Sequence, residues 1–108
     1  MVNSSVELDR SFAALAHPVR RGIVERLAGG PATVAVVSGG LGVSKPAISR
    51  HLRVLEEAGL LARVIEGRTH RLALRDHALD GATTWLARHR ALWERKLDVV
   101  DAYLKEQP

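Results

Sequence analysis

The chain has 108 residues, enough for one domain with a modest core, and its 16 basic and 12 acidic residues give a formal net charge of +4. It contains no cysteine, which excludes disulfides, thiolate nucleophiles and cysteine-based metal sites. No secretory signal is evident, and five glycines interrupt the longest uncharged run, Leu27–Ser44. We therefore expect a cytoplasmic protein with no membrane partner.

Two short helices are predicted at the start of the chain, at residues 6–16 and 19–28. His17 and Pro18 separate them, because proline ends one helix and can open the next. The apolar residues at helical spacing are Leu8, Phe12, Leu15 and Ala16 in the first helix and Ile23, Val24 and Leu27 in the second. These residues are expected to face inward.

A third helix is predicted at Val34–Leu41, with Thr33 as its N-cap. Gly39 and Gly40 would each cost such a helix about 1 kcal/mol relative to alanine. Residues 34–37 would also fit a buried strand. The position of this segment directly before another capped helix favours the helix, because that order is typical of a helix-turn-helix at residues 33–58.

The second helix of this motif is predicted to begin after Ser44 and to end before Gly59. At 100° per residue, its apolar residues share one face, which consists of Ile48, Leu52 and Leu55. Arg50 and Arg53 lie on the opposite face. A short helix that is packed on one side and cationic on the other is suited to the major groove of DNA.

A β-hairpin is predicted at residues 60–75, where two strands at 60–65 and 69–74 flank Glu66-Gly67-Arg68. In the second strand, Arg71 alternates with Leu72, so that one face is basic and the other apolar. Two strands alone are marginally stable, so the hairpin must pack against a helix.

Residues 76–105 are predicted to form one helix of about 45 Å at 1.5 Å per residue. Apolar residues dominate one stripe, which contains Leu79, Ala82, Leu86, His89, Trp93, Lys96, Val100 and Tyr103. Leu97 and Leu104 widen it, and Trp85, Leu92 and Val99 form a second stripe. A domain this small cannot cover such a helix, so pairing with a second copy is expected. The alternative is a helix that folds back onto its own core.

Positive charge is concentrated in the middle third of the chain. Residues 43–75 hold seven basic and three acidic side chains, a net of +4, while residues 1–42 carry +1 and residues 76–108 carry −1. This distribution fits a phosphate-binding surface, and a solvated face is the alternative.

The chain resembles the ArsR/SmtB-type bacterial transcriptional repressors. The similar passages are Phe12–Leu27, Val43–Leu60 and Glu66–Arg68 in the hairpin, and the resemblance covers about residues 8–104. It implies a single winged helix-turn-helix domain over residues 1–108, mainly α with a β-hairpin wing (α+β), in the order ααααββα. It also implies a homodimer, joined through the helices at 6–16 and 76–105, that represses transcription from operator DNA. The dimer-interface residues expected on this basis are Leu8, Phe12, Leu79, Leu86, Trp93, Leu97 and Val100.

The chain departs from the metal-sensing members of that family. It lacks their Cys-x-Cys motif, and their zinc pattern in the last helix would fall on Asp76, Ala78, His89 and Leu92. Only two of these four are ligands, whereas a closed zinc site uses four. No metal or other cofactor is predicted. A metal-responsive sensor with a rearranged site near His77 and Asp80 remains an alternative.

Residues of the second helix of the motif and of the wing are the candidate DNA contacts. Arg50 is expected to read guanine, with a phosphate contact or a solvated charge as the alternative. The remaining candidates are Ala47 and Ser49 for bases, Ser44, Lys45 and Arg53 for phosphates, Arg68 for a minor groove, and Thr69 and Arg71 for the backbone. The wing residues could instead belong to an ordinary exposed hairpin. His51 is expected to be packed and hydrogen-bonded, and His70 fits either role. Arg20 or Arg21 is expected to contact phosphate or to pair with Glu25.

Catalysis is not expected. Gly42–Pro46 lacks the last glycine of a nucleophile elbow, and Gly39–Lys45 lacks the second glycine and the hydroxyl residue of a phosphate loop. A winged-helix module that binds protein rather than DNA is a further alternative. Such modules usually lose their basic face, and this chain keeps Lys45, Arg50, Arg53, Arg63, Arg68 and Arg71. The sequence therefore favours a homodimeric repressor of an inverted-repeat operator in double-stranded DNA, and it identifies no inducer.

Overall fold

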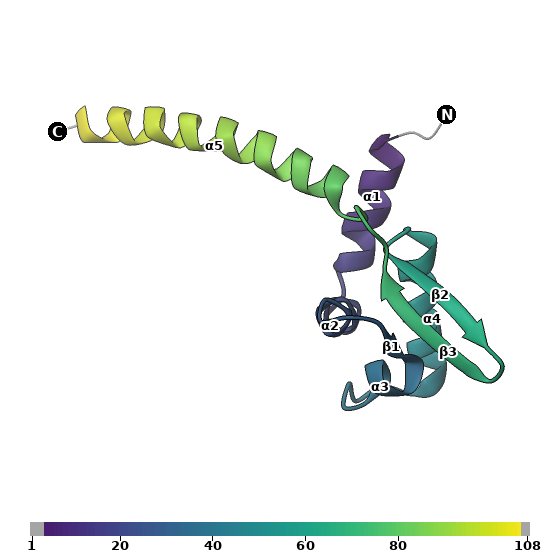
Figure 1. Ribbon diagram of the computed structural model, residues 1–108. Helices are drawn as coiled ribbons and strands as arrows, with labels where there is room; N and C mark the ends of the chain where they lie inside the picture. The colour runs from purple at the N-terminus through teal and green to yellow at the C-terminus, as the bar shows by residue number, and fades with distance from the viewer. Residues whose placement is uncertain (1–3, 107–108) are drawn as a thin grey trace.

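In the computed structural model, which describes residues 4–106, a small helical body carries a β-hairpin and a long helix that projects away from it (Figure 1). The elements are α1 Ser4–Leu15, α2 Pro18–Leu27, β1 Ala32–Thr33, α3 Val34–Ser38, α4 Lys45–Glu57, β2 Leu61–Glu66, β3 Thr69–Leu74 and α5 Asp80–Glu106. The predicted winged helix-turn-helix architecture is confirmed, with one strand added. None of the described helices is both long and apolar enough to cross a bilayer.

The added strand, β1, pairs antiparallel with β3, so that the sheet has the order β1-β3-β2. Ala32 lies opposite Leu72, and Thr33 lies opposite Arg71. A strand of two residues is too short to show an alternating pattern, so it was not expected from the sequence. Its effect is to attach the start of α3 to the base of the wing.

Helix α3 is shorter than predicted, because it ends at Ser38 rather than Leu41. Gly39 is already extended, with ψ of 132°, and Gly40 has a positive φ of 74°. Thr33 is the N-cap as predicted, since its hydroxyl accepts the N–H of Val36 at 3.3 Å. These two glycines therefore begin the turn of the helix-turn-helix and do not belong to its first helix.

Both predicted ends of α4 are confirmed. The Ser44 hydroxyl accepts the N–H of Ala47 at 3.3 Å. At the other end, Gly59 adopts φ of 76°, its N–H donates to the Glu56 carbonyl, and the N–H of Leu60 donates to the Leu55 carbonyl, both at 3.0 Å. This pair of bonds is a Schellman motif, which needs a left-handed residue where glycine stands.

The core lies where α2, α3 and α4 meet the base of the hairpin. Its buried members are Ala14, Ile23, Leu27, Val37, Ile48, Leu52, Leu55, Leu60, Leu61 and Leu72. The predicted apolar face of α4 is thus buried, which fixes the rotation of this helix about its axis.

Helix α5 begins at Asp80, so the prediction that it begins at residue 76 is wrong. His77 has φ of 61°, a left-handed conformation that a helix cannot contain, and its Nδ1 lies 2.8 Å from the carboxylate of Asp80. Leu79 consequently lies in the turn before the helix. Phe12 of α1 meets Trp85 edge-on at a ring separation of 5.8 Å, and beyond this contact α5 runs free of the body (Figure 1). The alternative that α5 folds back onto its own core is therefore wrong.

The position of Leu55 in the core leads to a stability prediction. Leu55 is fully buried, so Leu55→Ala should lower the free energy of unfolding by about 2–5 kcal/mol through lost burial and the cavity that remains. Urea denaturation at one fixed protein concentration measures this change. The control is Val64→Ala on the exposed wing, which should change stability by less than about 0.5 kcal/mol. Equal losses in the two variants would contradict this packing.

Candidate nucleic-acid interface

The exposed side of α4 carries the first group of candidate DNA contacts. Because Ile48, Leu52 and Leu55 point into the core, the helical rotation turns Arg50 and Arg53 outward, and both are exposed. Lys45, Ser44 and Ser49 are also exposed, while Ala47 is half-buried. The helix therefore presents two arginines and the small polar residues of its first turns on one accessible surface.

The wing carries the second group. Gly67 has φ of 62° at the first position of the two-residue loop, a conformation that suits glycine, and Arg68 follows it at the tip. Thr69 pairs with Glu66, and Arg71 pairs with Val64, on the face of the hairpin that points away from buried Leu72. Thr69 and Arg71 are both exposed, as the alternating pattern predicts.

The arginines of α2 are occupied by the protein itself. Arg20 donates to the carbonyl of Ala14 at 2.6 Å, and Arg21 donates to that of Leu15 at 2.8 Å. Arg26 donates to the carbonyls of Val37 and Gly39 beside the end of α3. These cations satisfy helix-end carbonyls, which carry partial negative charge. The predicted pairing of Arg20 or Arg21 with Glu25 is therefore wrong.

Five cations on α4 and the wing are not occupied in this way. Within residues 4–106, no ion pair or side-chain hydrogen bond involves Lys45, Arg50, Arg53, Arg68 or Arg71. All five are exposed. An unpaired surface cation is free to neutralise a phosphate without first breaking an internal contact. We call these five residues the free cation set.

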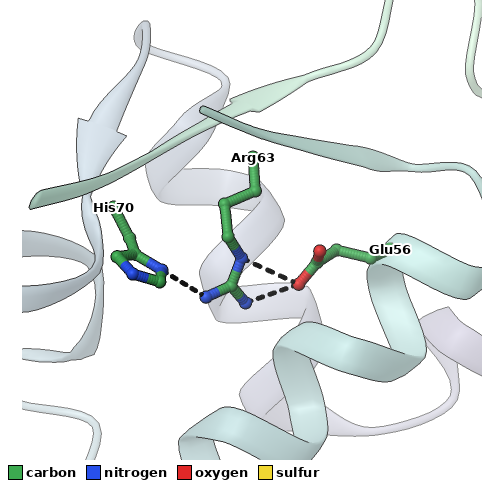
Figure 2. A network of polar contacts seen from close by, with 3 residues as sticks. All are labelled: Glu56, Arg63 and His70. Atoms are coloured by element: carbon green, nitrogen blue, oxygen red, sulfur yellow. Dashed lines mark hydrogen bonds and ion pairs between the residues drawn. The ribbon is translucent and has the colours of Figure 1, made fainter. Parts of the chain in front are cut away.

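Arg63 does not belong to the free cation set, so the expectation that it is part of the basic face is wrong. Figure 2 shows its guanidinium between the carboxylate of Glu56 and the ring of His70. The role of Glu56 was not expected from the sequence, because its partner Arg63 lies seven positions away on another element. The structure thus assigns His70 an internal hydrogen bond.

His51 is packed as predicted. Its ring lies 4.3 Å from that of His17, and its Nδ1 lies 3.2 Å from a guanidinium nitrogen of Arg20. Burial lowers the pKa of His51 below its ordinary value, and the nearby charges of His17, Arg20 and Arg50 lower it further. His17 itself caps α2, since its Nδ1 accepts the N–H of Val19 at 3.1 Å.

The residues considered for a metal site are not gathered in the described part of the chain. There, no three histidine, aspartate or glutamate side chains come within reach of one ion. His89 donates through Nδ1 to the carbonyl of Trp85 at 2.8 Å and stacks on the Trp85 ring at 4.1 Å. His77 contacts Asp80 as an exposed pair.

Comparison with known proteins identifies relatives of this arrangement. A helix-turn-helix domain family matches residues 15–64. The HTH-type transcriptional regulator Rv2034 of Mycobacterium tuberculosis is 53% identical over 53 residues, which are 49% of this chain and 50% of that regulator. The match therefore spans only half of that relative. The transcriptional repressor SdpR of Bacillus subtilis is 29% identical over 73% of this chain and 88% of its own length.

Solved structures extend the similarity to the whole fold. A crystal structure of an ArsR family transcriptional regulator superimposes with a TM-score of 0.79 at 32% identity, covering 87% of this chain and 97% of that one. A homodimeric winged helix-turn-helix DNA-binding domain from Mycobacterium bovis gives a TM-score of 0.61 at 25% identity, covering 80% and 82%. The named functions of these relatives are regulatory rather than enzymatic, as expected.

The environment of His51 predicts how stability depends on pH. Because the fold lowers its pKa, the unfolded chain binds a proton at this site more readily than the folded chain does. The free energy of unfolding should therefore decrease as the pH falls below about 6.5, until the lowered pKa is passed. His51→Asn keeps an acceptor for Arg20 but does not titrate, so this variant should lose less stability between pH 7.5 and 5.5. Urea unfolding across this range gives the comparison, and parallel profiles would contradict the assignment.

Proposed function

Since this chain belongs to the ArsR family of winged helix-turn-helix transcriptional regulators, we propose that it is a homodimeric repressor of an inverted-repeat operator in double-stranded DNA. The observation that carries this proposal is the free cation set, which is exposed and unpaired on α4 and the wing. DNA is a dense polyanion, and cations without internal partners bind it at the least cost.

In the proposed complex, α4 enters the major groove with its first turns foremost. Arg50 forms a bidentate pair with guanine, while Ala47 and Ser49 contact neighbouring bases. Lys45, Arg53 and the Ser44 end of the helix bind phosphates. Arg68 enters the flanking minor groove, and Thr69 and Arg71 contact the backbone there.

The proposed dimer follows from the exposure of α5. Among its described residues only Ala82 is buried, while Trp93 and Leu97 are 72% and 58% exposed. Apolar residues are exposed to water along about 40 Å of this helix, and the α5 helix of a second copy would bury them. The homodimeric mycobacterial domain supports this arrangement. The proposed interface consists of Leu8, Phe12, Leu79, Leu86, Trp93, Leu97 and Val100, with residues 6–16 and 76–105 as the dimerisation segments.

A two-fold axis through this interface would present two copies of α4 to successive major grooves, about one helical turn apart. A dimer bound over a promoter excludes RNA polymerase, which would account for repression. SdpR, whose length this chain nearly spans, is a transcriptional repressor. Such a regulator acts in the cytoplasm, where bacterial DNA is found.

Selection of bound sites from random duplexes, followed by a salt titration, tests the proposal. The selected sites should contain two half-sites in inverted orientation. The logarithm of the association constant should fall linearly with log salt, by about 0.9 for each phosphate neutralised. No binding to any duplex, or binding without salt dependence, would favour a protein-interaction module.

Arg50 and its neighbours should differ in how they affect sequence preference. Arg50→Ala should remove about 1–3 kcal/mol of discrimination at one base pair per half-site. Lys45→Ala and Arg53→Ala should instead weaken binding to all duplexes and reduce the salt slope by about one. Binding to a panel of single-base operator variants at fixed salt makes the comparison. An unchanged preference in Arg50→Ala would remove Arg50 from the base-reading role.

A charge placed on the apolar stripe of α5 should separate the subunits. Trp93→Glu puts a carboxylate in the proposed interface, so sedimentation velocity should show mostly monomer where the wild type is a dimer. The matched control is Ala91→Glu, two residues away on another face of the same exposed helix, which should remain dimeric. Dimers in both variants, or monomers in both, would contradict the proposed interface.

A further inference from the structure

The recognition helix α4 and both strands of the hairpin are joined by one polar network. Arg63 of β2 donates through Nε and Nη2 to Oε1 of Glu56 on α4, at 3.2 and 2.5 Å. The third guanidinium nitrogen, Nη1, lies 2.9 Å from Nδ1 of His70 on β3. Figure 2 shows the guanidinium held between the two partners. All three nitrogens of Arg63 are thus engaged within the protein.

This network differs from the other ion pairs of the described residues. Those pairs, His77 with Asp80 and Arg90 with Glu94, are exposed and join residues three or four positions apart. The side chains of Arg63 and Glu56 are only 24% and 31% exposed, and they join two different elements. Partial burial reduces the screening that makes surface pairs weak.

The network also lies at the point along the wing where its apolar residues stop packing into the core. At the base of the hairpin, Leu61 and Leu72 are buried in the core. Arg63 and Ile65 follow Leu61 on the same face of β2, and Ile65 is 61% exposed. Arg63 is therefore the last residue of β2 that is not exposed before the strand runs on to the tip of the wing.

We propose that Glu56, Arg63 and His70 are positioning residues that set the angle between the wing and α4. They would thereby fix the distance between Arg50 and Arg68, and none of the three would contact DNA. This inference rests on the proposed function. A wing that is already held in its bound orientation loses less conformational entropy on binding, so the network should strengthen the complex without touching it.

The chemistry of the network determines which substitutions preserve it. Arginine has only donors, so Nδ1 of His70 must accept and carries no proton in this contact. His70→Asn offers an amide oxygen near the position of Nδ1, whereas His70→Leu offers no acceptor. Glu56→Gln removes the charge of the carboxylate and keeps its size.

The sharpest test compares Glu56→Gln with Glu57→Gln in binding to the selected operator duplex. Each variant removes one negative charge from the end of α4, and Glu57 is exposed and forms no ion pair or side-chain hydrogen bond within residues 4–106. Simple electrostatics predicts that both variants bind the polyanion more tightly. The positioning role predicts that Glu56→Gln binds the duplex about fivefold more weakly, because losing the charged contact with Arg63 releases the wing. Glu57→Gln should bind as well as wild type or better. Tighter binding by both variants would overturn the proposal.

Two further comparisons separate positioning from direct contact. Arg63→Met should weaken binding, and adding Glu56→Gln to it should weaken binding no further, because the same interaction is already lost. His70→Asn should bind within about twofold of wild type and His70→Leu more weakly. Additive losses for Glu56 and Arg63 would overturn the proposal, as would equal losses for the two His70 variants. Circular dichroism shows whether each variant is folded.

The same variants distinguish failure of this inference from failure of the proposed function. If the wild type binds no duplex, the proposed function fails. The Glu56–Arg63 contact is then measured by a double-mutant cycle in urea unfolding, with hydrogen exchange of the wing amides as a second readout. Zero coupling and unchanged exchange in Glu56→Gln would overturn the positioning role whatever the protein binds.

Discussion

Burial of one face of α4 is the constraint on which the rest of this structure depends. Ile48, Leu52 and Leu55 point into the core. Because of the helical rotation, Arg50 and Arg53 then lie on the exposed face of the same helix. The Ser44 cap fixes where the helix begins, and thus which residues form its leading turn. Apolar packing in this way determines the geometry of a polar surface, although none of the packed residues belongs to that surface.

The positive charge of the chain divides into cations that build the fold and cations that remain free. Arg20 and Arg26 satisfy backbone carbonyls at helix ends, and Arg63 neutralises Glu56. A count of charges along the sequence treats all of these like Arg50 and Arg68. The distinction becomes visible only when partners are known, and within residues 43–75 it separates Arg63 from the free cation set on α4 and the wing. Specific binding needs cations in fixed places, which a net charge alone does not provide.

Local signals in the sequence were sufficient for the helix-turn-helix and the hairpin. Caps, apolar spacing and the glycine of the wing turn act over a few residues, so they can be identified without knowing the fold. The predictions were wrong where the structure depends on contacts between distant residues or on the backbone conformation of a single residue. Strand β1 exists only because β3 lies beside it, and α5 begins late because His77 takes a left-handed conformation. The partners of Arg20 and Arg63 lie on other elements, which a single sequence does not bring together.

The turn before α5 connects the surface that would read DNA to the helix that would join the subunits. Beyond the contact of Phe12 with Trp85, the described residues of α5 are exposed, so its apolar residues do little for the stability of the single chain. In the proposed dimer a partner would cover these residues, and the same step would place the second α4. A signal that altered the proposed repression would have to favour one arrangement of the two subunits over another, because a ligand that binds both arrangements equally does not shift the equilibrium between them. Within each chain, the residues between β3 and α5, where His77 has its left-handed conformation, are the covalent connection between the two parts.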